Sequence, residues 1–332
     1  MATPETPFWF WAVFTAAVLL ILAFDLGLAK RSGAARVSLR SAFVRTGIYV
    51  ALALMFAAGL YRLRDPDSAV AFVTGFLIEW SLSVDNVFVF VLVFAHFAVP
   101  ERLQHRVLFW GIVGALAMRG AMIAAGAALL ESFHWIAYVF GAILIVSGIK
   151  MLVAADAEPD IGRNRLVALL RRHMRVTEAF EGDRFFVRRD RLLYATPLFL
   201  ALAVIELADL VFAIDSIPAI FAVTADPFLV YTANVFAILG LRSLYFALAG
   251  VVHRFHYLKY GLSLVLMVVG TKMIVNGVFG GKVIPTWLAL AITALLVGGS
   301  IVLSLLRPRP EPRPLGWVPG TPPAEPHRTR ER

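Results

Sequence analysis

Long apolar runs separated by short polar segments are the dominant pattern of this sequence. Nine runs reach about eighteen residues or more, and they cover residues 8–28, 43–60, 69–99, 107–130, 133–153, 192–223, 228–252, 258–279 and 285–306. About 20 helical residues cross a hydrocarbon core of about 30 Å, so each run is long enough to span a bilayer. The pattern predicts an all-α polytopic membrane protein with about nine transmembrane helices.

Basic residues are distributed unevenly over the segments between these spans. With the N-terminus outside, most of the 31 Lys and Arg residues fall in inside segments, and the outside segments hold only Arg62, Arg64 and Lys282. Cytoplasmic loops carry an excess of Lys and Arg. We therefore predict that the N-terminus is outside and the C-terminus is cytoplasmic.

Three short motifs occur twice in the same order, 122 to 130 residues apart. The pairs are Val84-Asp85-Asn86-Val87 with Ile214-Asp215-Ser216-Ile217, Met118-Arg119-Gly120 with Leu241-Arg242-Ser243, and Gly148-Ile149-Lys150-Met151 with Gly270-Thr271-Lys272-Met273. Spans 3–5 thus match spans 6–8, and three crossings per unit would turn the second unit upside down. Inverted repeats with a binding site at the membrane midplane are typical of transporters. The alternative is a coincidental match between apolar runs.

These patterns divide the chain into six segments. We expect two N-terminal helices in 1–68, a three-helix repeat in 69–153, a cytoplasmic loop in 154–191, the inverted repeat in 192–280, a ninth helix in 281–306 and a disordered Pro/Arg-rich tail in 307–332. In the loop, residues 164–176 alternate Leu with Arg. This stretch predicts either an interfacial amphipathic helix or a solvated connector.

Composition supports the membrane class and limits the possible chemistry. The chain is 60% hydrophobic and 16% charged, which is outside the range of soluble globular proteins. Its net charge is +9, but apolar runs separate the Lys and Arg residues, so they form no single basic patch and we expect no nucleic-acid partner. It has no cysteine. Any metal must therefore be held by oxygen or imidazole ligands, and disulfides are excluded.

Nine charged residues fall inside the predicted spans. The acids are Glu79, Asp85, Glu206, Asp209 and Asp215, and the bases are Arg119, Lys150, Arg242 and Lys272. Each mid-span charge costs about 2.5–3.5 kcal/mol in a lipid environment, so these side chains must face one another or water. The single surplus negative charge favours attraction of a cation. Structural pairing without transport is the alternative.

The spacing of polar residues places oxygen atoms on one face of spans 3 and 6. Glu79, Ser83 and Asn86 fall on one helical stripe, and the repeat places Asp209 and Ser216 at matching positions.

A regular helix would not bring every oxygen-bearing side chain to that stripe. Asp85 and Asp215 lie about 100° away from it. We therefore expect local unwinding near both aspartates, where Pro218 would disrupt helical hydrogen bonds.

Carboxylate, amide, hydroxyl and carbonyl oxygens form a hard ligand set that suits Mn²⁺, Mg²⁺ or Ca²⁺. We assign Glu79, Asp85, Asn86, Glu206, Asp209, Asp215 and Ser216 as candidate ligands of a transported metal. We interpret the four bases as counter-charges that hold empty sites together. No catalytic residue and no bound cofactor is expected.

The motifs around these residues resemble those of the TerC family. They are Glu79-Trp80-Ser81-Leu82-Ser83-Val84-Asp85-Asn86, Phe212-Ala213-Ile214-Asp215-Ser216-Ile217-Pro218-Ala219 and the stretch Asn234 to Phe246. The segments Arg171-Arg172-His173, Phe185-Phe186-Val187-Arg188 and Phe255-His256-Tyr257-Leu258-Lys259-Tyr260-Gly261 are similar to its Alx branch. The resemblance covers about residues 8 to 306.

The resemblance implies a bacterial inner-membrane protein that exports Mn²⁺ and belongs to a family named for tellurium resistance. It also implies that Asp85, Asn86, Asp215 and Ser216 are central ligands, with Glu79, Glu206 and Asp209 as further ligands or proton carriers. The chain has no P-loop pattern, so we expect proton entry, not ATP hydrolysis, to drive export. Two alternatives are a membrane scaffold of a metal-stress complex and a transporter of Ca²⁺ or another cation. The expected partners are the metal ion, protons, the lipid bilayer and, for the scaffold, other membrane proteins.

Overall fold

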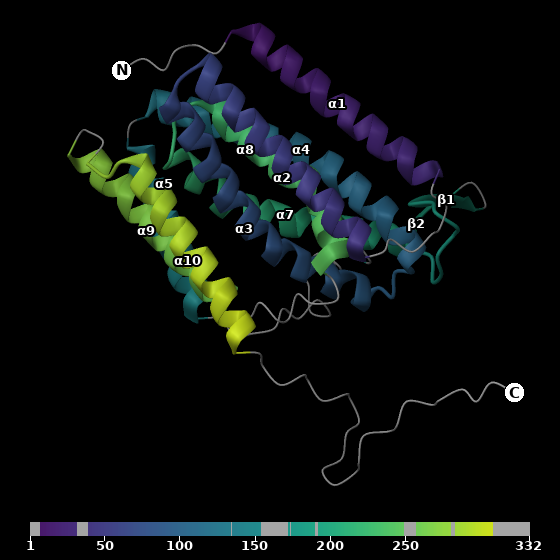
Figure 1. Ribbon diagram of the computed structural model, residues 1–332. Coiled ribbons are helices and arrows are strands. Elements are labelled where there is room, and N and C mark those ends of the chain that lie inside the picture. Colours follow the sequence, from purple (N-terminus) through teal and green to yellow (C-terminus); the bar gives the residue numbers. More distant parts are fainter. Residues whose placement is uncertain are drawn as a thin grey trace, which may run out of the picture.

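The computed structural model describes residues 7–31, 39–133, 135–153, 172, 174–189, 192–248, 257–279 and 283–307. Within these ranges the side chains of 23–31, Leu39, Asp85 and Phe88 are not described. The described part contains nine long helices and one two-stranded hairpin (Figure 1). The helices are α1 (Phe8–Arg31), α2 (Leu39–Leu63), α3 (Pro66–His96), α4 (Glu101–Ser132), α5 (Ile136–Val153), α7 (Pro197–Phe221), α8 (Pro227–Leu248), α9 (Leu258–Val278) and α10 (Thr286–Leu306).

Each of the nine apolar runs overlaps one of these helices, but the sixth run was predicted to begin too early, because residues 192–195 form strand β2 and α7 begins at Pro197. Eight helices are long and apolar enough to cross a membrane, and the described side chains of α1 add a shorter apolar stretch, Phe8–Leu22. The prediction of an all-α polytopic membrane protein is therefore confirmed. The sidedness of the termini and the six-segment division remain predictions.

Local sequence explains where several helices begin. The carboxylate of Asp65 caps α3, because its Oδ1 accepts a hydrogen bond of 2.7 Å from the backbone N–H of Ser68. Pro66 and Pro197 occupy the first turns of α3 and α7, where a missing N–H costs nothing.

Helices α5 and α9 approach each other through glycines. A Cβ atom on Gly270 would lie 2.7 Å from the carbonyl oxygen of Gly141, and one on Gly148 would lie 2.7 Å from the carbonyl oxygen of Ser263. Small residues let helix backbones pack this closely in membranes. With α10 this pair forms one side of the molecule, and α3 and α7 connect it to the rest (Figure 1).

The helix contacts agree with a two-fold relation between α3–α5 and α7–α9. Helix α3 packs on α8, and α7, which corresponds to α3 in the repeat, packs on α4. Corresponding helices also contact each other: α3 contacts α7, α4 contacts α8, and α5 contacts α9. The repeat itself remains a prediction. The inverted orientation of the two units remains a prediction.

The helices that carry the predicted ligands are unbroken. Helix α3 continues through Asp85, and α7 continues through Asp215 with Pro218 inside it. The expected unwinding is therefore wrong. Pro218 lies in the last turn of α7, where it removes a single backbone donor and the chain is about to leave the helix anyway.

An aromatic cluster fills one end of the bundle, near the N-termini of α3 and α8. Its rings are Phe14, Phe56, Phe72, Phe228 and Phe236, with neighbouring centroids 4.9–6.3 Å apart. At the same end Arg64 pairs with Asp226 at 2.5 Å, which connects the α2–α3 turn to the segment before α8.

The opposite end carries a hairpin that the sequence reading missed. Strands β1 (Phe186–Arg189) and β2 (Leu192–Ala195) pair antiparallel next to the start of α4. Arg106 of α4 forms an ion pair with Asp183 and lies over the ring of Phe185. Most of the predicted amphipathic stretch 164–176 and the tail 308–332 lie outside the described residues.

Candidate functional site

Arg119 of α4 lies at the centre of a buried polar cluster that joins four helices. Its guanidinium donates to both carboxylate oxygens of Asp209 on α7, from Nε at 3.0 Å and Nη2 at 2.7 Å. Its Nη1 forms an ion pair with Glu79 of α3. The same Nη1 donates to Ser216 Oγ at 3.2 Å and to Asn234 Oδ1 on α8 at 2.9 Å.

The cluster is almost completely removed from solvent. The exposed fractions are 1% for Glu79, 1% for Arg119 and 3% for Asp209. Two carboxylates against one guanidinium leave a net charge of −1 when all three are ionised. A buried uncompensated charge is costly, so the cluster favours the arrival of a proton or a metal cation.

Two oxygen atoms in the cluster have no hydrogen-bond donor among the described residues. They are Oε2 of Glu79 and Oδ1 of Asn86, both fully buried. Asn86 turns its amide nitrogen toward Asp209, where Nδ2 donates a long hydrogen bond of 3.5 Å to Oδ1. Buried acceptors are normally satisfied, so this pair of oxygens is suited to a cation ligand.

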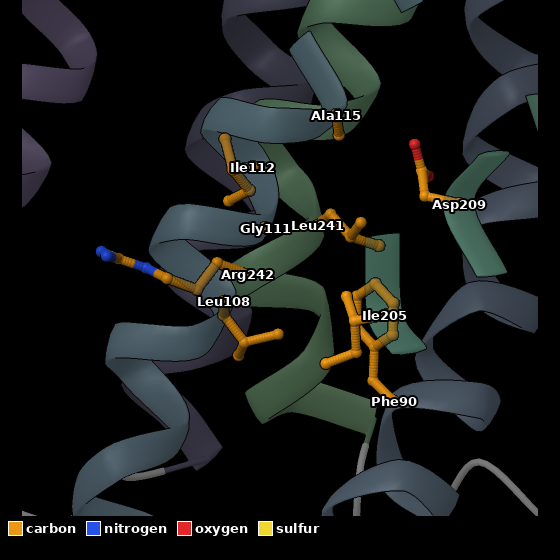
Figure 2. A pocket seen from close by; sticks show the side chains of 9 residues that line it. All are labelled: Phe90, Leu108, Gly111, Ile112, Ala115, Ile205, Asp209, Leu241 and Arg242. Atoms are coloured by element: carbon orange, nitrogen blue, oxygen red, sulfur yellow. The ribbon is translucent and has the colours of Figure 1, made fainter. Parts of the chain in front are cut away.

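A small, mostly apolar cavity of about 10 Å³, which has room for about one water molecule, borders Asp209 (Figure 2). In Figure 2, Asp209 and Ala115 mark one end of it, and Phe90 and Leu108 mark the other. The cluster therefore borders a small space beside Asp209.

Glu206 lies one turn before Asp209 on α7 and is half-buried. Its carboxylate lies against Gly114 of α4, where a Cβ atom would be 2.1 Å from Oε1. No hydrogen bond or ion pair joins Glu206 to another described side chain. This carboxylate is separate from the Arg119 network but close enough to Asp209 to interact with it electrostatically.

Asp215 lies on another face of α7 and contacts α5. Its Oδ1 accepts a hydrogen bond of 2.5 Å from Ser147 Oγ, and it interacts electrostatically with Lys150, which is exposed. Asp215 is thus not part of the Arg119 cluster. Asp85 occupies the matching position on α3, but its side chain lies outside the described residues.

The remaining predicted counter-charges are buried. Arg242 of α8 lines the cavity and is 5% exposed, and Lys272 of α9 is 3% exposed. In Figure 2 the guanidinium of Arg242 extends away from Asp209. Both side chains make polar interactions within the protein.

The structure brings together four of the seven predicted ligands, Glu79, Asn86, Asp209 and Ser216. Among the described side chains no group of three or more His, Asp or Glu residues has the arrangement of a metal site. A metal at the cluster would therefore combine two carboxylates with neutral oxygens. The assignment of the ligands remains a prediction.

Sequence reasoning missed Asn234, which accepts from Arg119 and donates to the carbonyl oxygen of Val230 at 3.0 Å. The available signal was its side chain, because Asn234 is the one amide in the predicted span 228–252. Asn86, in contrast, had been identified by its helical spacing from Glu79 and Ser83.

Comparisons with known proteins place this architecture among bacterial membrane proteins. The profile of the integral membrane protein TerC family matches residues 64–311. An uncharacterized membrane protein, STKORF319, of Myxococcus xanthus is 48% identical over 302 residues, which are 91% of this chain and 93% of that protein.

Two further relatives extend the comparison. A protein of Escherichia coli K12, provisionally named the membrane-bound redox modulator Alx, is 48% identical over 284 residues, or 83% of this chain and 88% of that protein. An uncharacterized membrane protein of Rickettsia bellii is 40% identical over 297 residues, which are 90% of this chain and 97% of that protein. No solved structure matches.

Proposed function

The chain belongs to the TerC family of integral membrane proteins, and we propose that it is a secondary transporter that exports a divalent metal cation, most simply Mn²⁺, across the bacterial inner membrane in exchange for protons. The observation that carries the proposal is the Arg119 cluster. Two carboxylates there share one guanidinium, and the buried oxygens Glu79 Oε2 and Asn86 Oδ1 have no hydrogen-bond donor in the part of the chain that the structure describes.

The chemistry of the cluster favours a hard metal ion. Glu79, Asp209, Asn86 and Ser216 offer carboxylate, amide and hydroxyl oxygens, which suit Mn²⁺, Mg²⁺ and Ca²⁺. Because these donors come from α3 and α7, a bound cation would hold together the two helices that the repeat relates.

Arg119 acts in this proposal as a tethered substitute for the metal. In the structure it occupies both carboxylates, which removes most of the cost of burying them. A divalent cation that binds Glu79 and Asp209 must displace the guanidinium. When a proton neutralises Glu79 the metal is released, and Arg119 returns to Asp209.

Proton entry supplies the energy that export requires. Moving a divalent cation out against an inside-negative potential costs about 4.6 kcal/mol per 100 mV, at about 2.3 kcal/mol per charge. Glu206, next to the cluster and without an ion-pair partner among the described side chains, is the residue we assign to proton delivery.

Access to the cluster is asymmetric in this conformation. The small cavity beside Asp209 lies on the side of Phe90 and Leu108, whereas Phe72, Phe228 and the Arg64 ion pair fill the opposite end of the bundle. With the hairpin end in the cytoplasm, as the distribution of Lys and Arg predicts, metal would enter from inside the cell when this cavity widens. Export then requires the Arg64–Asp226 pair to separate.

The test is transport by the purified protein in liposomes. With Mn²⁺ and an opposing pH gradient, we expect the wild-type protein to move Mn²⁺ and consume the gradient. Glu79→Gln and Asp209→Asn should abolish both, because each removes a ligand charge with little change of shape. Glu131→Gln, on the exposed end of α4, is the matched control and should transport normally.

The outcomes separate the proposal from its rivals. If the wild-type protein alone moves no ion, a scaffold role replaces transport. Preference for Ca²⁺ in competition would change the cargo but keep the site. The name of the Alx relatives refers to redox modulation; since this chain has no cysteine, such an effect would not come from its own thiols but from the cargo or a partner.

A further inference from the structure

One face of the hairpin exposes apolar and basic side chains together. The strand register pairs Phe186 with Ala195 and Arg188 with Leu193, so Phe186, Arg188 and Leu193 lie on the same face. Leu193 is 65% exposed and Phe186 is 40% exposed. We call these three residues and Arg175, which lines the adjoining hollow, the hairpin face.

The hairpin is fixed to the bundle, so the exposure of this face is not a property of a loose loop. Val187 and Ala195 are buried. The backbone N–H of Thr177 donates to the carbonyl oxygen of Ala195 at 2.9 Å, and the N–H of Ala195 donates to the carbonyl oxygen of Arg175 at 2.8 Å. The hairpin therefore presents its face in a defined direction.

The hairpin face adjoins the start of α7, which is long and apolar enough to cross a membrane. The ring of Phe186 packs on Phe199, in the first turn of α7, with centroids 4.5 Å apart. Leu193 lies two strand residues beyond Ala195, or about 7 Å along the same face. Each interfacial layer of a bilayer is about 5–7 Å thick, so the hairpin face begins at the hydrocarbon edge and crosses the headgroup region.

The charges on the face complement an anionic headgroup. Arg175 and Arg188 are exposed, and neither forms an ion pair with a residue that the structure describes. Guanidinium groups bind phosphate through paired hydrogen bonds, and apolar side chains beside them can enter the acyl boundary. The neighbouring Arg189 differs, because it lies on the other face and pairs with Glu181.

We propose that the hairpin face is a binding surface for anionic phospholipids, with Phe186 and Leu193 inserted at the acyl boundary and Arg175 and Arg188 on the phosphates. The surface ties the segment before α7 to the bilayer. It does not depend on the cargo of the transporter.

Site-directed spin labelling tests this directly, because the chain has no native cysteine. Leu193→Cys and, as a control, Glu178→Cys at an exposed position are labelled with a nitroxide in the full-length protein. The protein is reconstituted in phosphatidylcholine vesicles with and without phosphatidylglycerol. We expect the ratio of oxygen to nickel-chelate accessibility to be several-fold higher at 193 than at 178, and to rise further with phosphatidylglycerol.

The charge requirement is tested by neighbouring arginines on opposite faces of β1. Arg188→Gln should abolish the rise caused by phosphatidylglycerol, whereas Arg189→Gln, which removes the same charge, should not. Equal effects of the two substitutions would overturn the assigned face. The proposal also fails if the label at 193 is as accessible to the nickel chelate as the label at 178, or if it is shielded from both reagents, as in a protein contact.

Discussion

Replacing Arg119 by methionine tests the central cluster most severely. Arg119→Met keeps a long side chain but leaves Glu79 and Asp209 buried without their shared cation. Removing one partner of a buried ion pair costs about 3–5 kcal/mol, and Arg119 also donates to Ser216 and Asn234. We expect the folded-state equilibrium to fall by about a hundredfold to several thousandfold.

Thermal unfolding in detergent micelles, followed by tryptophan fluorescence, measures this loss. Combining Arg119→Met with Glu79→Gln and Asp209→Asn should recover most of it, because the cluster then contains no charged side chain. Mn²⁺ should also stabilise Arg119→Met, by about 2.7 kcal/mol at a hundred times its dissociation constant. The wild-type protein should gain less, since the metal must first displace Arg119.

Two results would refute the reasoning. If Arg119→Met is as stable as the wild-type protein, the two carboxylates do not depend on the guanidinium. If Mn²⁺ stabilises the neutral triple variant as much as Arg119→Met, the metal binds elsewhere. Either result would rule out the proposal that Arg119 takes the place of the metal between the two carboxylates.

Three further predictions concern the surrounding helices. Burial raises the pKa of Asp65, but the hydrogen bonds from the side chain and backbone of Ser68 outweigh it and hold that pKa below the ordinary 3.8. Asp65→Ala should therefore lower the free energy of unfolding by about 1 kcal/mol at neutral pH, as measured by thermal unfolding. This difference from the wild-type protein should shrink as the pH falls below 3.8 and disappear below the folded-state pKa, because Asp65 is then protonated in the folded state as well as in the unfolded state. If the stability difference between Asp65→Ala and the wild-type protein persists at low pH, the charged Asp65 carboxylate does not stabilise α3 as a cap. Gly114→Ala should displace the Glu206 carboxylate and reduce the rate of Mn²⁺ transport in liposomes. Gly298→Ala is the control, because open space surrounds Gly298, and it should leave the rate unchanged. Equal transport rates for the two variants would show that transport does not require Glu206 in its present position. Gly270→Ala should lower the unfolding temperature, because its Cβ would meet a carbonyl oxygen of α5 at 2.7 Å, and an unchanged temperature would contradict that close packing.

The sequence predicted the spans and the polar stripes because both follow from one-dimensional periodicity. Apolar runs of bilayer length located the nine long helices of the described residues. Helical spacing placed Glu79 with Asn86 and Asp209 with Ser216, and these four side chains do meet. Which base would join them was not predictable, since Arg119 and Arg242 occupy matching positions and only the packing of α4 against α7 selects Arg119.

The assumption of one shared site caused the main error of local structure. Asp215 lies about 100° from Ser216 on a regular helix, and the expected break was meant to bring both to one point. The helix instead stays regular, and Asp215 binds Ser147 on α5. The hairpin was missed because its strands are only four residues long and do not alternate apolar with polar residues. They are also joined by the charged run Arg188-Arg189-Asp190-Arg191, which is typical of a solvated loop.

The most direct measurement of the central claim is anomalous X-ray scattering from crystals of the protein soaked in Mn²⁺. The account predicts one strong peak within direct coordination distance of Glu79 and Asp209, close to the amide oxygen of Asn86, with the guanidinium of Arg119 moved away. A peak beside Asp215 alone, with Arg119 still bound to both carboxylates, would contradict it.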